Sequence, residues 1–354
     1  MKESRFYTKL YEGQSLKNNL SKEKVISNKL VQCNLCGRGC KISKDSYGFC
    51  NSMQNIDGKL YSINYGRIAS YHIDPIEKKP LYHFLPGSST FSIGGFGCNF
   101  SCLNCQNYML ATNSYNLDNS IKILPETIVK NALDKNCLSI SWTYNEPTPY
   151  FDFARETSLL AHSKNLKNVY VSNGYMSGES LDETLKFIDA FNIDLKSFSN
   201  DFYRRICGGN LDIVLDNLRT IHDARKRYGT HLEITSLLIG ELNTGEDEIR
   251  SICNFIIEEL GPEVPLHFSR FFPMYKMSDG EPTKLEYLIR ARDIAIEMGI
   301  EHVYLGNMQA DNNSYCPECG ELLISRTAYC NRDKNRIKDG HCSTCGHKLN
   351  FVFE

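Results

Sequence analysis

The chain has 354 residues, which is enough for one large domain with appendages or for two domains. Its 40 basic and 42 acidic residues give a formal net charge of -2, so the bulk charge does not indicate a nucleic acid or an anionic membrane as partner. No apolar stretch approaches the roughly 18 residues of a membrane span, and the first residues are too polar for a signal peptide, so we expect a cytoplasmic protein.

Fifteen cysteines distinguish this sequence. In a reducing compartment, clustered cysteines indicate metal binding more than disulfides. Four of them lie in 33–50, three in 98–105 and five in 316–345. The three isolated cysteines, Cys137, Cys207 and Cys253, are expected to be small buried side chains. Cys207 is the least certain of them, because it lies in a glycine-flanked segment.

Residues 1–30 are rich in lysine and asparagine and weakly patterned, so we expect a loosely ordered lead-in with one short helix. A cysteine-rich unit is expected over 31–84. Its cysteines would be liable to oxidation unless they held a metal, and both zinc and an auxiliary iron–sulfur cluster fit their spacing. A thioredoxin-like redox role does not fit, because no βαβ pattern precedes the first pair. The four candidate metal ligands are Cys33, Cys36, Cys40 and Cys50.

From about residue 85 to 310, short apolar runs alternate with longer stretches of helical period. The expected strands are Thr90–Gly94, Leu138–Thr143, Asn168–Ser172, Phe191–Leu195, His231–Ile239, Val264–Phe268 and His302–Leu305. The expected helices lie near Pro149–His162, Leu181–Ala190, Leu211–Tyr228, Glu246–Leu260 and Lys284–Met298. This alternation predicts right-handed crossovers and a parallel sheet. With six or seven such units, the expected fold class is α/β, a partial parallel (β/α) barrel.

A glycine-rich loop with three cysteines follows the first expected strand, with the spacing Cys98-x3-Cys102-x2-Cys105. Three thiolates can hold three irons of a [4Fe–4S] cube and leave the fourth iron open to another ligand. A zinc knuckle or a plain electron-transfer cluster would need a fourth cysteine close by, and none lies within 30 residues after Cys105. This spacing, with an aromatic before the last two cysteines, resembles the signature of the radical S-adenosylmethionine (SAM) superfamily.

Polar residues follow the later strands, and in a parallel barrel ligands bind at these carboxyl ends. Glu146 could accept a charge-assisted hydrogen bond from the SAM ammonium; the alternative is a surface carboxylate that caps the next helix. Asp194 and Lys196, two residues apart on one face, could bind the ribose hydroxyls and the SAM carboxylate, or form only a solvated ion pair. Asn173 and His267 are further candidates for contacts with the cofactor. No GxGxxG or P-loop pattern precedes a helix.

Five phrases in this order resemble the radical SAM enzyme of the AmmeMemoRadiSam system, a relative of the pyruvate formate-lyase activating enzymes. They are Tyr144-Asn145-Glu146-Pro147-Thr148, Ser172-Asn173-Gly174-Tyr175, Asp194-Leu195-Lys196-Ser197-Phe198, the run from Pro265 to Pro273, and Tyr304-Leu305-Gly306-Asn307. In the activating enzymes the matching positions contact SAM, which implies the same for Glu146, Asn173, Asp194 and Lys196. Arg38-Gly39 departs from the proline that usually follows the second N-terminal cysteine in this family.

The resemblance implies a radical SAM core over 85–310, a [4Fe–4S] cluster on the catalytic cysteines Cys98, Cys102 and Cys105, and reductive cleavage of SAM to a 5′-deoxyadenosyl radical. The radical would abstract hydrogen from an unidentified substrate, which could be a protein. Implied partners are AMMECR-type and Memo-type proteins of the same system and a reductant such as flavodoxin or ferredoxin. Two alternatives stay open: activation of a glycyl-radical enzyme, and a non-catalytic metal-bearing binding module.

The last segment, 311–354, contains two C-x2-C knuckles, each followed by glycine, which is typical of a structural zinc ribbon. Its expected zinc ligands are Cys316, Cys319, Cys342 and Cys345. Cys330, between the knuckles, could replace one of them. The basic residues between the knuckles are expected to form a solvated face or to dock an acidic partner; they are Arg326, Arg332, Lys334, Arg336 and Lys338.

Overall fold

The computed structural model describes residues 1–10, 29–112, 120–327 and 330–354. Its centre is an eight-stranded sheet with the order β16-β15-β14-β13-β12-β11-β9-β8. The parallel strands are β9 (Ser89–Gly94), β11 (Ser139–Trp142), β12 (Lys167–Ser172), β13 (Ala190–Asp194), β14 (His231–Leu238), β15 (Leu266–Arg270) and β16 (Val303–Gly306). The sheet is open, with β8 and β16 at its edges, and the predicted parallel α/β core is confirmed.

The edge strand β8 (Ser70–Pro75) runs antiparallel to β9 and was not predicted. Three of its six residues are exposed and only one is buried, so the apolar run that identifies the other strands is missing here.

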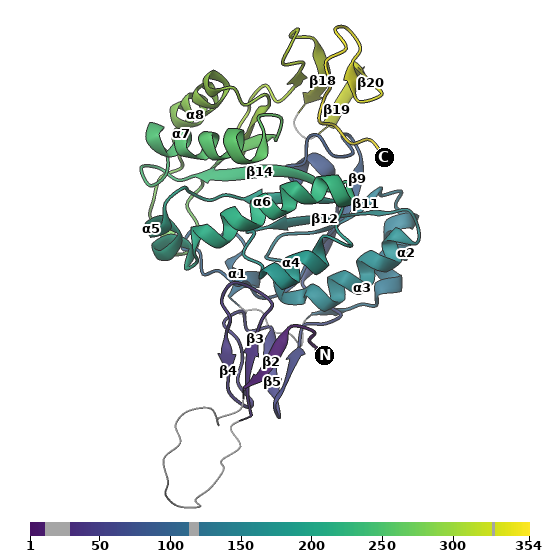
Figure 1. Ribbon diagram of the computed structural model, residues 1–354, viewed down its shortest axis with the longest axis vertical. Helices are drawn as coiled ribbons and strands as arrows, with labels where there is room; N and C mark the ends of the chain where they lie inside the picture. The colour runs from purple at the N-terminus through teal and green to yellow at the C-terminus, as the bar shows by residue number, and fades with distance from the viewer. Residues whose placement is uncertain (11–28, 113–119, 328–329) are drawn as a thin grey trace, which may run out of the picture.

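Helices follow the strands and pack on the sheet. They are α2 (Pro125–Asp134), α3 (Phe151–His162), α4 (Gly178–Thr184), α6 (Leu211–Tyr228), α7 (Glu246–Phe255) and α8 (Leu285–Met298), with the short α1 (Tyr108–Ala111) and α5 (Asn200–Phe202). Single turns add η1 (Ile76–Lys78), η3 (Thr148–Tyr150), η4 (Tyr203–Cys207), η5 (Ile256–Leu260) and η6 (Tyr275–Met277). Helices α2, α3, α4 and α6 cover the face of the sheet that is turned to the viewer in Figure 1. No helix in the described ranges is long and apolar enough to cross a membrane.

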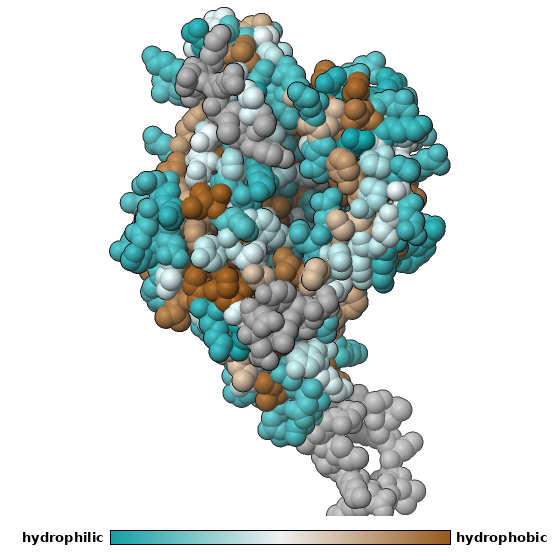
Figure 2. Space-filling view, turned by 180° about the vertical axis from the view of Figure 1, so that it is seen from behind, coloured by the Kyte–Doolittle hydropathy of each residue, from teal (hydrophilic) through white to brown (hydrophobic). Residues whose placement is uncertain are grey.

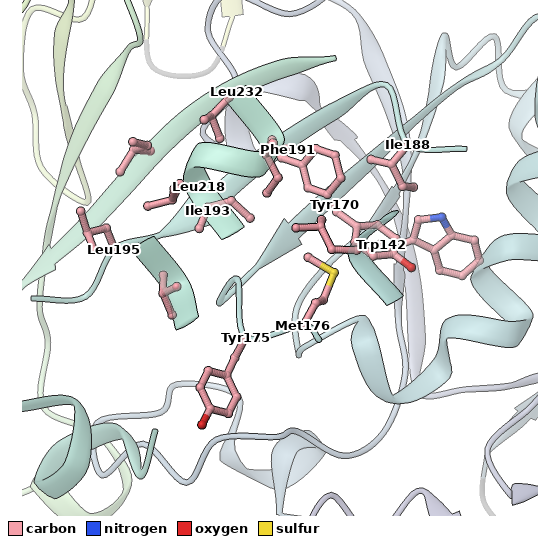
Figure 3. Packing of buried hydrophobic residues seen from close by; sticks show 14 of the residues in the cluster. Trp142, Tyr170, Tyr175, Met176, Ile188, Phe191, Ile193, Leu195, Leu218 and Leu232 are labelled. Carbon is pink, nitrogen blue, oxygen red and sulfur yellow. The ribbon is translucent and has the colours of Figure 1, made fainter. Parts of the chain in front are cut away.

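The two faces of the sheet differ in chemistry because side chains alternate along each strand. One cross-strand row is aromatic: Trp142 pairs in register with Tyr170, and Tyr170 with Phe191. Figure 3 shows these three rings side by side in the packed core. The opposite row carries Asn192 next to Glu233, both buried. The face with the aromatic row is therefore buried under the helices, and the opposite, inner face combines polar residues with the apolar side chains of Val169 and Ala190.

The segment from Leu81 to Leu85 is buried, and its apolar side chains pack on Val169 and Ala190 of the inner face. The Glu233 carboxylate accepts hydrogen bonds from the backbone N–H groups of Tyr82 (3.0 Å) and His83 (2.7 Å). The His83 ring also bonds to the backbone oxygen of Asn350 (2.9 Å) and stacks on Phe351 with the ring centroids 3.7 Å apart. This layer attaches the C-terminal segment to the core.

The N-terminal unit consists of two small sheets, β2-β3-β4 and β1-β6-β5. Their strands are β1 (Lys2–Glu3), β2 (Tyr7–Leu10), β3 (Leu30–Cys33), β4 (Lys41–Ile42), β5 (Met53–Ile56) and β6 (Lys59–Ser62). Two further strands, β7 (Arg67–Ile68) and β10 (Ile121–Lys122), pair with each other. Most of residues 1–10 therefore belong to these sheets, and the short helix expected in the lead-in is not found in 1–10 or 29–30; residues 11–28 lie outside the described ranges.

The C-terminal unit lies at the end of the molecule opposite to the N-terminal unit (Figure 1). Its strands are β17 (Ser314–Tyr315), β18 (Leu322–Thr327), β19 (Cys330–Asn335), β20 (Ile337–Lys338) and β21 (His341–Cys342). The expectation of a solvated basic face is wrong for Arg326, which is buried and donates to the backbone oxygen of Tyr82 (2.7 Å) and to Ser314 Oγ (2.7 Å). Figure 2 shows that on the face opposite to Figure 1 hydrophilic residues dominate and apolar residues form small separate patches.

Candidate functional site

The loop after β9 is held tightly against the N-terminal unit. Gly97 has φ = 85°, and a Cβ there would lie 2.3 Å from both the backbone oxygen of Cys50 and Ser52 Oγ. The backbone oxygen of Phe96 accepts hydrogen bonds from Ser52 Oγ (2.9 Å) and Asn64 Nδ2 (3.1 Å). Glycine is therefore required at 97 because a left-handed backbone and a close approach coincide there.

This loop presents three free thiols, those of Cys98, Cys102 and Cys105, all partly buried. Its backbone is fixed by the bond from Ser101 N–H to the backbone oxygen of Cys207 (2.9 Å). The donor set fits a [4Fe–4S] cluster, because three thiols on one loop leave the fourth iron without a cysteine from that loop. In the described residues these three sulfurs do not all lie within 4.8 Å of one another as the C-terminal ones do, which suits ligands that bind separate irons.

Cys207 is a residue of this site that the sequence interpretation placed among ordinary buried side chains. It is fully buried and lies close enough to Cys102 to lower the pKa of the Cys102 thiol. In the sequence, only the glycines that follow Cys207 set it apart from the other isolated cysteines, and they do not indicate that it lies next to Cys102.

Glu146 lies in the loop after β11 and is buried, so the surface-carboxylate alternative is wrong. Its Oε1 accepts hydrogen bonds from Ser172 Oγ (2.9 Å) and from the N–H and hydroxyl of Thr148, and its Oε2 accepts one from Asn173 N–H (2.8 Å). Burial raises the pKa of Glu146, although these hydrogen bonds oppose the rise. The carboxylate thus joins the ends of β11 and β12 and has acceptor capacity left at Oε2.

Asn173 directly follows β12 and reaches the cysteine loop. Its Nδ2 donates to Asn99 Oδ1 (2.7 Å) and lies 3.9 Å from Cys98 Sγ. Asn99, which the sequence interpretation did not single out, donates in turn to the backbone oxygen of Tyr175 (3.3 Å). The amide of Asn173 is therefore placed at the edge of the three-cysteine loop, and its contact with the cofactor stays a prediction.

Asp194 and Lys196, at the end of β13, form an ion pair with Nζ and Oδ2 2.7 Å apart. Burial lowers the pKa of Lys196, but Asp194 and the thiols of Cys102 and Cys207 outweigh it, so the pKa is raised well above its ordinary value. The pair exists, as the ion-pair alternative proposed, and it also lies close to a cysteine of the loop.

His267 lies elsewhere. Its Nε2 is 2.7 Å from Glu233 Oε2, and its ring packs edge-on against Tyr82 with centroids 4.9 Å apart. The described contacts do not bring it to Glu146, Asn173 or the cysteine loop. A contact of His267 with a cofactor remains a prediction.

The four predicted C-terminal cysteines come together. The sulfurs of Cys316 and Cys345 are 3.6 Å apart and those of Cys319 and Cys342 are 3.8 Å apart. Four thiolates around one zinc at ~2.3 Å would be about 3.8 Å from one another, so the donor set fits a tetrahedral site. These four complete the arrangement without Cys330, whose side chain lies outside the described part.

Comparison with known proteins gives a family match in the core. The model of the radical SAM superfamily matches residues 92–256, which include the three-cysteine loop and neither of the other cysteine groups. An uncharacterized protein of Methanocaldococcus jannaschii is 41% identical over 333 residues, covering 93% of this chain and 98% of that protein. A putative glycyl-radical enzyme activating enzyme of the same organism is 24% identical over 213 residues, covering 60% of this chain and 77% of its own length.

Among solved structures, a domain of a pyruvate-formate lyase-activating enzyme from Bacteroides vulgatus superposes with a TM-score of 0.42 at 16% identity. That match covers 48% of this chain and 99% of the other.

Proposed function

We propose that this chain reductively cleaves S-adenosylmethionine and abstracts hydrogen from a substrate, because its residues 92–256 match the model of the radical SAM superfamily. A [4Fe–4S] cluster on Cys98, Cys102 and Cys105 would supply the electron for cleavage of a carbon–sulfur bond. The observation that carries the proposal is the convergence of three strand ends on the cysteine loop. Asn173 approaches Cys98 Sγ to 3.9 Å, and Lys196 lies close enough to Cys102 for the two to shift each other's pKa.

The chain's own groups would orient the cofactor. Glu146 Oε2 accepts one hydrogen bond from the protein and can accept another, from the SAM ammonium. Lys196 offers a cation for the SAM carboxylate, and Asp194 is partly exposed and could accept from the ribose hydroxyls. Each of these groups is held by bonds to the backbone or to a neighbour, so little ordering remains to be done when the cofactor binds.

We assign a zinc ion to the C-terminal cysteines, supported by their 3.6 and 3.8 Å sulfur separations. Four thiolates close the coordination shell, so this zinc would be structural.

We propose two classes of substrate. Membership of the AmmeMemoRadiSam system, with AMMECR-type and Memo-type partners and a flavodoxin or ferredoxin as reductant, is our first proposal. Activation of a glycyl-radical enzyme is the second, supported by a 24% identical relative with that putative name. In the first case hydrogen would come from a partner of that system, and in the second from the α-carbon of a glycine.

The test is release of 5′-deoxyadenosine by the anaerobically reconstituted, dithionite-reduced protein. We expect product from the wild type and from Cys137→Ala, a buried cysteine remote from the site, and none from the combined Cys98→Ala, Cys102→Ala and Cys105→Ala variant. The triple variant should lose about four irons and keep its zinc. If the reduced wild type with its full iron content releases no 5′-deoxyadenosine, the chain is a metal-bearing binding module and the proposal is wrong.

A deuterium-transfer experiment separates the two substrate proposals. Candidate partner proteins are prepared with deuterated glycine and incubated with the enzyme and unlabelled SAM. Deuterium in 5′-deoxyadenosine together with a glycyl radical signal in the partner would favour glycyl-radical activation. Deuterium transferred only from an AMMECR-type or Memo-type protein labelled at other residues would favour the first proposal.

A further inference from the structure

The four cysteines of the N-terminal unit surround one cavity. Cys33 ends β3, Cys36 and Cys40 lie on the following loop, and Cys50 precedes β5. All four line the cavity, and none forms a disulfide. Four converging thiols in a reduced protein indicate a metal site.

The spacing of these sulfurs separates the two metals that fit the sequence. In the described residues, only the C-terminal cysteines bring three or more ligand atoms within 4.8 Å of one another, which is the geometry of a single ion. The N-terminal cysteines line a common cavity but are more widely spaced, as are the three of the central loop. Wider spacing suits thiolates that each bind a different iron at the corners of a cube.

This cavity shares a wall with the central site. Asn99, next to Cys98, and Thr148, which bonds to Glu146, both line it. The peptide of Cys50 lies directly against Gly97, which leaves no room for a side chain between the two loops.

Arg38 ties the same two loops together. It follows Cys36 by two residues and donates to the backbone oxygens of Asn99 and Gly208. Its guanidinium also stacks on Phe49 at 3.4 Å from the ring centroid. A fixed cation therefore lies between the two cysteine groups, where it would reduce the repulsion of two anionic clusters.

We propose that Cys33, Cys36, Cys40 and Cys50 hold a second [4Fe–4S] cluster, which relays single electrons to the central cluster. With four protein ligands it has no open iron, so it would not bind SAM. In each relay step a low-potential one-electron donor protein is oxidised by one electron, the second cluster is reduced and reoxidised, and the central cluster gains that electron; no bond to protein forms or breaks. The relay rests on the proposed function, whereas the presence of the cluster does not.

The metal content of the wild-type protein tests the site without any mutation. Anaerobically reconstituted full-length protein should contain about eight irons, about eight sulfides and one zinc per chain. About four irons with two zinc ions would overturn the proposal in favour of an N-terminal zinc site. Mössbauer spectra should show [4Fe–4S] iron only.

Variants assign the two clusters separately. The triple variant of Cys98, Cys102 and Cys105 to alanine should keep about four irons and, when reduced, an EPR signal that SAM does not change. Cys36→Ala with Cys40→Ala should lose those irons and keep a signal that SAM does change. Cys253→Ala, a buried cysteine outside all three groups, should match the wild type in iron and EPR. An iron-free triple variant that remains folded by circular dichroism would refute the second cluster.

The rate at which the central cluster is reduced tests the electron relay separately. With dithionite, the Cys36→Ala/Cys40→Ala variant should reduce its central cluster at the wild-type rate, and with a reduced ferredoxin or flavodoxin at least tenfold more slowly. Equal rates with the protein donor would refute the relay while leaving the cluster assigned. If the wild type cleaved no SAM but held eight irons, the proposed function would fail and the second cluster would stand.

Discussion

His302 offers a stability test of the layer that joins the C-terminal segment to the core. Its side chain is buried, and its ring meets that of His83 edge-on with centroids 4.4 Å apart. Phe351 lies edge-on at 6.0 Å. A ring in such surroundings is stable when neutral, and a charge on it would be costly.

The size of the effect follows from the pKa. Burial lowers the pKa of His302 from 6.5 to about 4, and the charges of Arg326 and His347 act in the same direction, while Glu233 opposes them. Between pH 6.5 and about pH 4, the His302 ring is protonated in the unfolded chain but neutral in the folded chain. The free energy of unfolding therefore falls as the pH falls. For this one group the free energy of unfolding should drop by about 1.3 kcal/mol between pH 7.5 and 5.5, and by roughly 3 kcal/mol once the pH reaches 4.

The assay is urea denaturation of the holo protein at pH 7.5 and 5.5 under anaerobic conditions. His302→Phe keeps a ring of similar size among aromatic neighbours and removes the titrating group. We expect the pH-dependent loss to be smaller by about 1 kcal/mol in this variant than in the wild type. Burial also lowers the pKa of His83, so part of the pH-dependent loss of stability will remain in both proteins.

His72→Phe is the matched control, because His72 is exposed on β8 and the same substitution there should leave the pH dependence at the wild-type value. Equal losses in wild type and His302→Phe would refute the argument that a buried neutral His302 causes acid sensitivity.

Three further predictions concern contacts around the site. Cys207→Ala removes the buried thiol next to Cys102, which can donate a hydrogen bond to that cluster ligand, so the midpoint potential of the central cluster should fall by about 40 mV in an EPR-monitored titration. Asp74→Asn leaves the ammonium of Lys79, which is 2% exposed, without its carboxylate at 2.7 Å, and should cost about 3 kcal/mol of unfolding free energy in urea. Gly97→Ala should lower the iron content of the reconstituted protein at least twofold, because the added Cβ would displace the loop.

Each of these three predictions has a matched control variant. Cys253→Ala removes a buried thiol away from the cluster and should leave the potential unchanged. Lys78→Gln removes the half-exposed partner of the same aspartate and should cost less than about 0.5 kcal/mol. Gly178→Ala adds a Cβ into open space and should keep full iron content. Equal effects in a variant and its control would contradict the stated cause.

Local patterns were enough for the elements of the core. The helix predicted over Leu211–Tyr228 has those bounds, because Asn210 caps its start through the N–H of Asp212 and Gly229 ends it with φ = 71°. The helix expected at Leu181–Ala190 instead runs from Gly178 to Thr184, since the Ser177 hydroxyl caps it earlier than the apolar period shows.

The surroundings of Glu146 and Arg326 needed the tertiary structure. Sequence patterns indicate which residue types favour contact with water. Because both residues are charged, a position on the surface was expected as an alternative to a buried one. Glu146 is buried because four hydrogen-bond donors from two strand ends compensate its desolvation. Arg326 is buried because the backbone oxygens of Tyr82 and Asn312 accept from its guanidinium.

By itself, the sequence determined the three-cysteine loop, the two outer cysteine groups and the alternation of strands and helices, because each depends on spacing within a few residues. Only the tertiary structure decided that Cys207 lies next to Cys102, that Arg38 donates to Asn99, and that His267 bonds to Glu233. These contacts join segments far apart in the chain, and strand order and loop packing bring them together. Periodicity reports which face of an element is buried, but it carries no information on which distant side chain lies against that face.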